Sequence, residues 1–436
     1  MNALIGDPLP GLGLSLYDLF NEDRLLAPFD ASKSALGQGC QGSMGAHNGV
    51  SLFRLGYDTV VPETGRQETV SGLLALPDLE GLAGRTLPLL SWQHGTIFEA
   101  ADAPSQLCEG GTVQRDGLGV PRSAETLFNV VRFAGNGFVV SAADYLGNGL
   151  SRATQAYAVK GATVQTLLHQ LAAARAVLQQ RGLKTGPLFL NGWSQGGLNS
   201  QWFGWALQER GVPVSALAAV SAPTDLPMLV GYWMNNFPGS PNWLTAAMPL
   251  LFGSYETYYG LTDYGLKDLM AEAIRPQYLT IAREIYAKTY DWAHVDWTSP
   301  NPICRPNSLE EPRICLPVLA RQMLNPDFLA ACNHGDHPFM QRIRANTALQ
   351  GRYAMPCRFY GGSGDAVVPG WSSMLLPVEH QQRLGSTLAG AVPVTMGDTH
   401  TPAGAPRPGG THRSSFLASL FDPGLSVQRW CAAACA

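Results

Sequence analysis

The residues best suited to chemistry surround a serine in the middle of the chain. Residues 192–197 read Gly-Trp-Ser-Gln-Gly-Gly, so Gly192 and Gly196 flank Ser194 at two positions before and two after. An apolar run precedes this motif and an apolar helical pattern follows it. Such glycines are typical of a strained strand-to-helix turn, where a Cβ would clash and the helix N-terminus faces the serine. We therefore predict that Ser194 is a nucleophile for acyl transfer, the alternative being an ordinary glycine-rich turn.

A serine nucleophile needs a base and an acid that orients the base. Residues 360–369 read Tyr-Gly-Gly-Ser-Gly-Asp-Ala-Val-Val-Pro and place Asp365 in a glycine-rich loop after an expected strand. Where this serine motif occurs, the order along the chain is serine, then the acid, then the histidine. We predict that Asp365 is the acid, the alternative being an aspartate that only forms a turn.

Two histidines follow the last expected strand, and either could be the base. His400 comes first, and His412 lies just before an expected helix at 414–420. The segment 401–410 between them contains three prolines and three glycines, which predicts an irregular loop. We favour His412, because the helix would hold its backbone rigidly and a base needs a fixed position. His400 remains the alternative.

Acyl transfer also requires N–H groups that stabilise the oxyanion. The residue after the nucleophile, Gln195, would supply one backbone N–H, and the loop after the third strand would supply another. That loop reads His-Gly-Thr at 94–96, and Thr96 is the expected second donor, with Gly95 allowing close approach of the backbone. His94 precedes Ser194 in the chain, so we interpret it as a structural residue and not as the base.

Two other segments resemble ligand sites. Residues 332–337 read Cys-Asn-His-Gly-Asp-His, but their spacing matches no established metal site. We interpret them as a polar loop, with Cys332 a candidate for a disulfide. Residues 144–151 have glycine spacing loosely like that of a phosphate-binding loop, but the dinucleotide fingerprint is absent and a structural turn is expected. We predict no metal and no cofactor.

The elements that position these residues alternate between strands and helices, which predicts an α/β fold with a mostly parallel sheet covered on both faces. Residues 52–60 and 69–76 are expected to form an antiparallel pair with a turn at 62–65. Helical spacing of apolar residues predicts a helix over 164–178. The other expected strands are 86–92, 137–142, 187–191, 214–221, 357–360 and 392–396.

Strand patterns disappear between about residues 223 and 354, where the pattern is mostly helical and rich in aromatic residues. We predict a core formed by 51–222 and 355–436, a mainly helical cap inserted at 223–354, and an N-terminal extension, 1–50, packed on the core.

The composition argues against a nucleic-acid partner, and the cysteines bear on the cellular compartment. The chain has 436 residues, a formal charge of −4 and a pI of about 6.1, with no basic excess for a nucleic-acid partner. No apolar run is long enough to span a membrane. Eight cysteines favour disulfides, with Cys304–Cys315 and Cys431–Cys435 the closely spaced pairs, although eight buried thiols in the cytoplasm are the alternative. Because disulfides favour export, we expect a secreted or periplasmic protein; the N-terminus as given is not a signal peptide, so the leader would have been removed.

Five segments together resemble bacterial α/β-hydrolases related to the secretory lipases. The resemblance implies the α/β-hydrolase fold and hydrolysis of carboxylic esters through an acyl-enzyme, without a cofactor and often outside the cytoplasm. A histidine followed by a helix in such proteins supports His412, although the proline- and glycine-rich loop from Thr401 departs from the pattern. The matching segments are 90–96, 144–151, 192–197, 221–225 and 361–369.

We therefore predict an esterase or lipase that acts on hydrophobic small-molecule or polymeric esters, with polyesters among the candidates. A peptidase or amidase with the same triad is the first alternative, and a non-catalytic binding module on the same fold is the second. The aromatic residues of the cap either favour apolar acyl and aryl groups or form the core of the cap itself. They are Tyr232, Trp233, Trp243, Phe252, Tyr255, Tyr258 and Tyr259.

Overall fold

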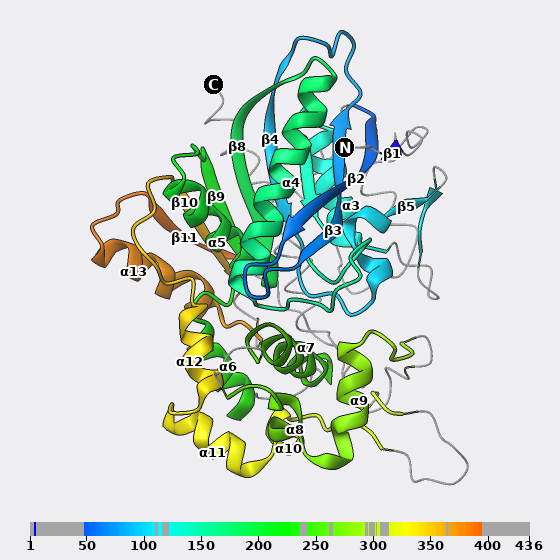
Figure 1. Ribbon diagram of the computed structural model, residues 1–436. Helices are drawn as coiled ribbons and strands as arrows, with labels where there is room; N and C mark the ends of the chain where they lie inside the picture. Colours follow the sequence, from blue (N-terminus) through cyan, green and yellow to red (C-terminus); the bar gives the residue numbers. More distant parts are fainter. Residues whose placement is uncertain are drawn as a thin grey trace, which may run out of the picture.

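The computed structural model describes residues 4–5, 48–109, 112–115, 122–235, 242–260, 265–292, 295, 301, 303–305, 314–362, 365 and 367–394. Its main feature is a nine-stranded sheet in the order β1-β2-β3-β7-β4-β8-β9-β10-β11 (Figure 1). The strands are β1 (Leu4–Ile5), β2 (Val50–Val60), β3 (Gln67–Pro77), β4 (Thr86–Gln93), β7 (Val139–Ala143), β8 (Lys184–Trp193), β9 (Ala216–Val220), β10 (Cys357–Gly362) and β11 (Ala389–Val394). A separate two-stranded hairpin is formed by β5 (Cys108–Glu109) and β6 (Thr112–Val113).

The pairing of the strands confirms the predicted mostly parallel sheet. Neighbouring strands are antiparallel from β1 through β2 and β3 to β7. From β7 onward, through β4, β8, β9 and β10 to β11, neighbouring strands are parallel. The predicted antiparallel pair at the start is β2 and β3, joined by a turn in which Gly65 has a φ of +70°. Because the carboxyl ends of the parallel strands meet at one edge of the sheet, the loops that follow β4, β8, β9 and β10 are neighbours there.

Helices cover both faces of the sheet. One face packs against α4 (Lys160–Gln180), α5 (Gln195–Glu209) and α13 (Leu376–Arg383), and the other packs against α3 (Ala124–Asn129) and the π-helical turn that follows it. Strand β8 shows how the sequence divides between the two faces. Leu188 and Leu190 point to the α4–α5 side and Phe189 points to the α3 side, as the two-residue period of a strand requires.

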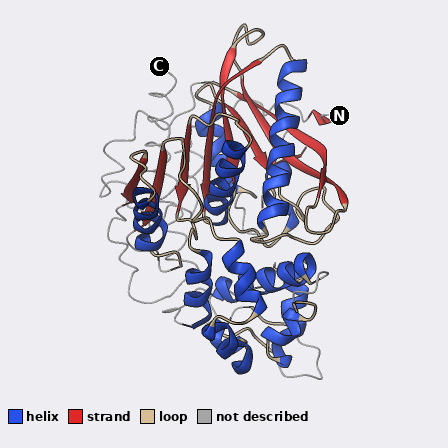
Figure 2. Ribbon diagram, turned by 60° about the vertical axis from the view of Figure 1, so that its left-hand side comes forward, coloured by secondary structure: helices blue, strands red, loops and turns tan. Residues whose placement is uncertain are grey.

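The described secondary structure between β9 and β10 is helical, in agreement with the helical pattern of the sequence. These helices gather at one edge of the sheet in both views (Figures 1 and 2). They are α6 (Leu226–Asn235), α7 (Asn242–Tyr259), α8 (Leu269–Ala273), α9 (Pro276–Tyr286), α10 (Ala320–Met323), α11 (Pro326–His334) and α12 (Pro338–Ala345).

Hydrogen bonds hold this helical group against the loop that follows β7. Ser254 on α7 donates its hydroxyl to the carbonyl of Gln155 at 2.7 Å. Lys288, which follows α9, donates its Nζ to the carbonyl of Gly147 at 2.9 Å. Burial lowers the pKa of Lys288 to about 8, although Asp102 and Asp144 nearby raise it. The helical insertion therefore contacts the same edge of the sheet at which the parallel strands end.

Some elements were not predicted from the sequence, and some predictions lie outside the described residues. The hairpin β5–β6, the helix α3 and the helix α13 are short and lack a clear period, so the sequence pattern did not reveal them. The helix expected at 414–420 and the N-terminal extension, apart from Leu4–Ile5 and residues 48–50, lie outside the described part of the chain. The last strand begins at Ala389, three residues before the predicted start.

The cysteines confirm one predicted pairing and correct another expectation. Cys304 and Cys315 form a disulfide across a loop of the helical insertion. Cys332, which the sequence suggested as a disulfide partner, is instead a free thiol buried in the hydrophobic cluster that joins the insertion to the α/β core. Burial raises its pKa to about 12, and Glu272 nearby raises it further. Cys108 and Cys357 are also free, while Cys40, Cys431 and Cys435 lie outside the described residues.

We expect at least one further disulfide, because Cys431 and Cys435 are close enough in sequence to pair if locally helical. Titration of denatured, unreduced protein with a thiol reagent should then detect four or fewer of the eight cysteines as free thiols. Six free thiols would show that Cys304–Cys315 stands alone, and eight would contradict both the pairing and the expected export. A mass spectrum of the unreduced tryptic digest identifies the pairs.

Candidate active site

Ser194 occupies the turn between β8 and α5 in an unusual backbone conformation. Its φ is +56° and its ψ is −121°, values that few non-glycine residues adopt. Its N–H donates to the carbonyl of Val220 on β9 at 2.8 Å, and its own carbonyl accepts from the N–H of Leu198 at 3.2 Å. The residue is only 7% exposed. Hydrogen bonds on both sides thus hold Ser194 in a strained conformation of the kind that clusters at functional sites.

The two flanking glycines are required by close backbone packing. A Cβ on Gly192 would lie 2.2 Å from the carbonyl oxygen of Gly196. A Cβ on Gly196 would lie 2.0 Å from the carbonyl oxygen of Gln93, at the end of β4. Real Cβ atoms do not approach oxygen so closely, so either side chain would push the turn away from the loop after β4. The spacing noted in the sequence therefore reflects a contact between two strand ends.

The loop formed by residues 94–96 lies beside Ser194. β4 and β8 are parallel neighbours, and their register pairs Gln93 with Gly192. Both chains then leave the sheet at the same edge. Gln195 is the first residue of α5, where helical amides have no intrahelical acceptor. The N–H of Thr96 has no acceptor among the described residues, and the Thr96 hydroxyl lies 2.9 Å from the Tyr157 hydroxyl.

His94 is held as a neutral, buried ring. Its Nδ1 lies 2.7 Å from the carbonyl oxygen of Gly95, its Nε2 lies 3.3 Å from that of Asp144, and its ring stacks on Tyr145 with centroids 4.1 Å apart. Burial lowers the pKa of His94 to about 4, a shift that these two carbonyls partly oppose and that Lys288 reinforces. As a neutral ring, His94 carries one N–H and donates to only one of these carbonyls, and its burial fits the structural role expected from the sequence.

Asp365 follows β10 at the same edge of the sheet as Ser194. The register aligns Trp193 of β8 with Val220 of β9, and Val220 with Tyr360 of β10, so the loops after β8 and β10 are separated by one strand. The Asp365 carboxylate is 5% exposed, and its Oδ1 accepts from the N–H groups of two following residues, Val367 and Val368, at 3.0 Å each. The helical insertion contacts this loop, because Trp233 on α6 donates its indole N–H to the carbonyl of Val367 at 2.7 Å.

The structure therefore brings three of the predicted features to one edge: Ser194 with Gln195, the 94–96 loop, and Asp365. His400 and His412, the two candidates for the base, lie outside the described residues. The choice of His412 stays a prediction.

The glycine-rich segment at 144–151 forms a structural turn, as expected. The buried Asp144 accepts from the Ser71 hydroxyl at 2.5 Å and from the Ser105 N–H at 2.8 Å. Gly149 has a φ of +58°, and a Cβ there would lie 2.0 Å from the Asp144 carboxylate. The glycine thus makes room for a protein carboxylate, which would repel a phosphate.

In the 332–337 segment, His337 makes structural contacts with the start of α12 and with Glu272. His337 precedes α12, where its Nδ1 accepts from the N–H of Phe339 at 3.1 Å, and its Nε2 lies 3.0 Å from a carboxylate oxygen of Glu272. Within the described ranges, no three His, Cys, Asp or Glu side chains are grouped so that they could hold a metal ion.

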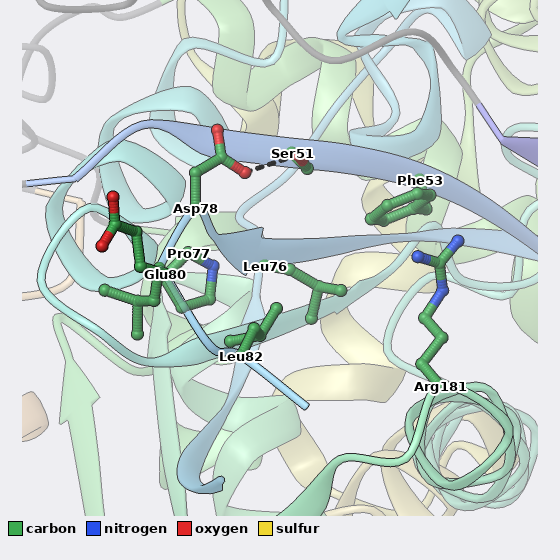
Figure 3. Close-up of a pocket in the computed structure, with 9 residues that line it drawn as sticks. Ser51, Phe53, Leu76, Pro77, Asp78, Glu80, Leu82 and Arg181 are labelled. Carbon is green, nitrogen blue, oxygen red and sulfur yellow. Dashed lines mark hydrogen bonds between the residues drawn. The ribbon is translucent and has the colours of Figure 1, made fainter. Parts of the chain in front are cut away.

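A pocket of about 430 Å³ lies away from this edge (Figure 3). Its lining includes Leu82 and Arg181, which precede the starts of β4 and β8, so it lies at the opposite end of the parallel strands from Ser194. The Ser51 hydroxyl in its wall donates to the Asp78 carboxylate at 2.6 Å, and the Arg181 guanidinium lies 4.3 Å from the centroid of the Phe53 ring. The pocket does not belong to the Ser194 site.

Sequence reasoning missed one residue that contacts the site. Glu125 on α3 accepts the N–H of Gly95 on its Oε1 at 2.8 Å, although it is only 8% exposed. No local pattern marks this glutamate, since its partner lies 30 residues earlier in the chain.

Comparison with known proteins supports the fold. Neither protein-family models nor curated protein sequences match the chain. Among solved structures, the rice cell wall degrading esterase LipA from Xanthomonas oryzae matches with a TM-score of 0.67 at 21% identity, covering 90% of this chain and 95% of that one. The chain has the α/β-hydrolase fold. This confirms the fold class predicted from the sequence.

Two further structures share this α/β-hydrolase fold. A Legionella pneumophila protein described provisionally as a hydrolase matches with a TM-score of 0.67 at 19% identity, over 89% of this chain and 93% of that one. Lipase A from Candida antarctica matches with a TM-score of 0.53 at 13% identity, over 79% and 72%. Of these three structures, one is named as an esterase and one as a lipase. No helix among the described residues is long and apolar enough to cross a membrane.

Proposed function

We propose that this α/β-hydrolase is a carboxylic ester hydrolase with Ser194 as its nucleophile. The observation that carries the proposal is the strained, buried Ser194 at the turn between β8 and α5, packed through Gly196 against the 94–96 loop. Ser194 Oγ attacks the ester carbonyl, and the tetrahedral oxyanion accepts hydrogen bonds from the N–H groups of Gln195 and Thr96. The alcohol leaves, and water releases the acid from the acyl-enzyme.

The base in this proposal is His412, oriented by Asp365. Support for Asp365 comes from its buried carboxylate at the same edge as Ser194 and from the backbone N–H groups that hold its Oδ1. His412 takes the proton from Ser194 Oγ and delivers it to the leaving alcohol, while Asp365 stabilises the imidazolium.

We propose small or medium-sized apolar esters as substrates. The aromatic residues of the helical insertion give little support to a polyester site, because most of them are buried in a hydrophobic cluster that the insertion shares with the α/β core. Phe252 and Tyr255 are fully buried, and Tyr258 and Tyr259 are nearly so. Tyr232 is partly exposed, and burial together with the charge of Asp365 raises its pKa.

The helical insertion, residues 223–354, is the proposed cap over this site, within a core formed by 51–222 and 355–436. Its contact with the Asp365 loop through Trp233 supports that assignment. The Cys304–Cys315 disulfide supports export to the periplasm or the medium, because such bonds persist in oxidising compartments.

Turnover of p-nitrophenyl butyrate compared with butyryl p-nitroanilide tests the proposal. An ester hydrolase should turn over the ester at least 10³-fold faster in kcat/KM, and a fluorophosphonate probe should label the protein at Ser194 only. Comparable turnover of the anilide would favour a peptidase or amidase. Absence of both turnover and labelling would favour a binding module.

A further inference from the structure

Glu125 stands out among the buried groups that the mechanism above does not use. It lies on α3, between β4 and β7, with its carboxyl beneath the 94–96 loop. Its Oε1 accepts the N–H of Gly95 at 2.8 Å, and its Oε2 has no hydrogen-bond partner among the described residues. A buried carboxyl without a cationic partner is costly, and no cation in the described part of the chain acts on Glu125, so its presence calls for a role beyond packing.

Gly95 itself is held on two sides. A Cβ on this residue would lie 2.6 Å from the Trp193 ring and 3.4 Å from Glu125 Oε2. Trp193 is the last residue of β8 and directly precedes Ser194. The peptide of Gly95 is therefore confined between the nucleophile turn and the Glu125 carboxyl, and the next residue along is Thr96.

The raised pKa of Glu125 is compatible with its position beside the Gly95 N–H. Burial raises its pKa to about 8, the Gly95 N–H opposes that rise, and Asp102 reinforces it. At neutral pH the carboxyl is therefore mostly uncharged. An uncharged acceptor can hold an N–H group without opposing the negative charge that develops nearby on an ester oxygen.

We propose that Glu125 is a positioning residue, which fixes the 94–96 loop through the Gly95 N–H and so sets where the Thr96 N–H meets the oxyanion. The proposal rests on the proposed ester hydrolase function. In this proposal Glu125 contributes to transition-state stabilisation indirectly, through the loop, and does not itself contact the substrate. Misplacement of a catalytic group by about 1 Å can cost 10²-fold in rate, and loss of one oxyanion donor about 10²–10³-fold.

Three variants test the role of Glu125. Glu125→Ala removes the acceptor, and Glu125→Gln keeps an oxygen acceptor in a neutral side chain of the same shape. Asn129→Ala is the matched control, since Asn129 donates its amide to the backbone carbonyl of Glu125 at 2.8 Å and supports α3 without touching Gly95. Steady-state kinetics on p-nitrophenyl butyrate and the melting temperature are measured for each variant.

We expect Glu125→Ala to lower kcat by about 10–100-fold with KM within about threefold, because the loss concerns the transition state. Glu125→Gln should keep kcat within about threefold of wild type, and Asn129→Ala should lower the melting temperature while leaving kcat unchanged. A trifluoromethyl ketone, which forms an oxyanion on the nucleophile, should bind Glu125→Ala more weakly by the same factor as kcat/KM falls.

The results separate the two proposals. If Glu125→Ala keeps wild-type kcat, or if the Gln variant falls as far as the Ala variant, Glu125 does not position the loop. If Glu125→Ala fails to fold, Glu125→Met removes the acceptor and keeps the bulk of the side chain: a loss of kcat of about 10–100-fold at wild-type melting temperature supports the proposal, and an unchanged kcat overturns it. Fluorophosphonate labelling of the wild type at Ser194 reports on the proposed function alone, and its absence would overturn both proposals.

Discussion

Replacement of Ser194 by alanine is expected to lower ester turnover by about 10⁶-fold at an unchanged melting temperature. The nucleophile would be lost, while the N–H of residue 194 could still donate to Val220 and the backbone strain at φ +56° would persist with another Cβ residue. Kinetics on p-nitrophenyl butyrate and thermal unfolding measure the two effects. The fluorophosphonate probe should no longer label the variant.

Ser221 provides the matched control for this experiment. It lies at the end of β9, is fully buried, and has a φ of +44°, so it is a second strained serine one strand away from Ser194. Its hydroxyl has no hydrogen-bond partner among the described residues. We expect Ser221→Ala to keep turnover within about threefold of wild type. Activity of Ser194→Ala within tenfold of wild type would show that the nucleophile lies elsewhere.

Replacement of His412 by alanine is expected to reduce turnover almost as far as Ser194→Ala, whereas His400→Ala should retain most activity. Members of a triad act as a unit, so removal of the base costs about as much as removal of the nucleophile. His412 adjoins an expected helix that can lock its backbone, and His400 begins a segment rich in proline and glycine. Turnover of a short-chain ester by both variants, at matched folded concentration, measures the difference.

The reverse result would assign the base to His400. A collapse of both variants would mean that one histidine orients the loop that carries the other. Rescue of turnover by added imidazole would then distinguish them, because a small base can replace the missing proton acceptor but not a residue that shapes the loop. The Asp365 assignment is independent of this choice, since its loop is held by its own backbone hydrogen bonds.

The sequence alone was sufficient for the fold class and for the strand framework. Continuous apolar runs bounded by glycine or proline mark buried parallel strands, and residues 187–191 lie inside β8 as predicted. The turn at Ser194 was also visible, because the need for glycine at 192 and 196 arises from backbone contacts within a few residues and from one neighbouring strand end. The need for Gly192 arises within the turn, and the need for Gly196 arises from Gln93 on β4, but both are met by glycines next to Ser194 and so leave a pattern in adjacent residues.

Only the tertiary structure revealed the features that depend on contacts between distant parts of the chain. It showed that Cys304 and Cys315 pair with each other, whereas Cys332 is a free thiol buried in an apolar cluster. It also showed that Phe252 and Tyr255 are fully buried, in a hydrophobic cluster that joins the helical insertion to the α/β core. A helical period reveals which residues share a face, but it does not reveal what that face meets.

Glu125 illustrates the same limit at the site itself. In sequence it is one acidic residue in a short helix that no period marked, and most glutamates are exposed. Its importance arises only when the sheet places β4 beside β8 and α3 packs beneath the loop that follows β4, so that its carboxyl meets the N–H of Gly95. The sequence gives the chemical type of each side chain, whereas the environment of that side chain is determined by residues distant in the chain that folding brings into contact.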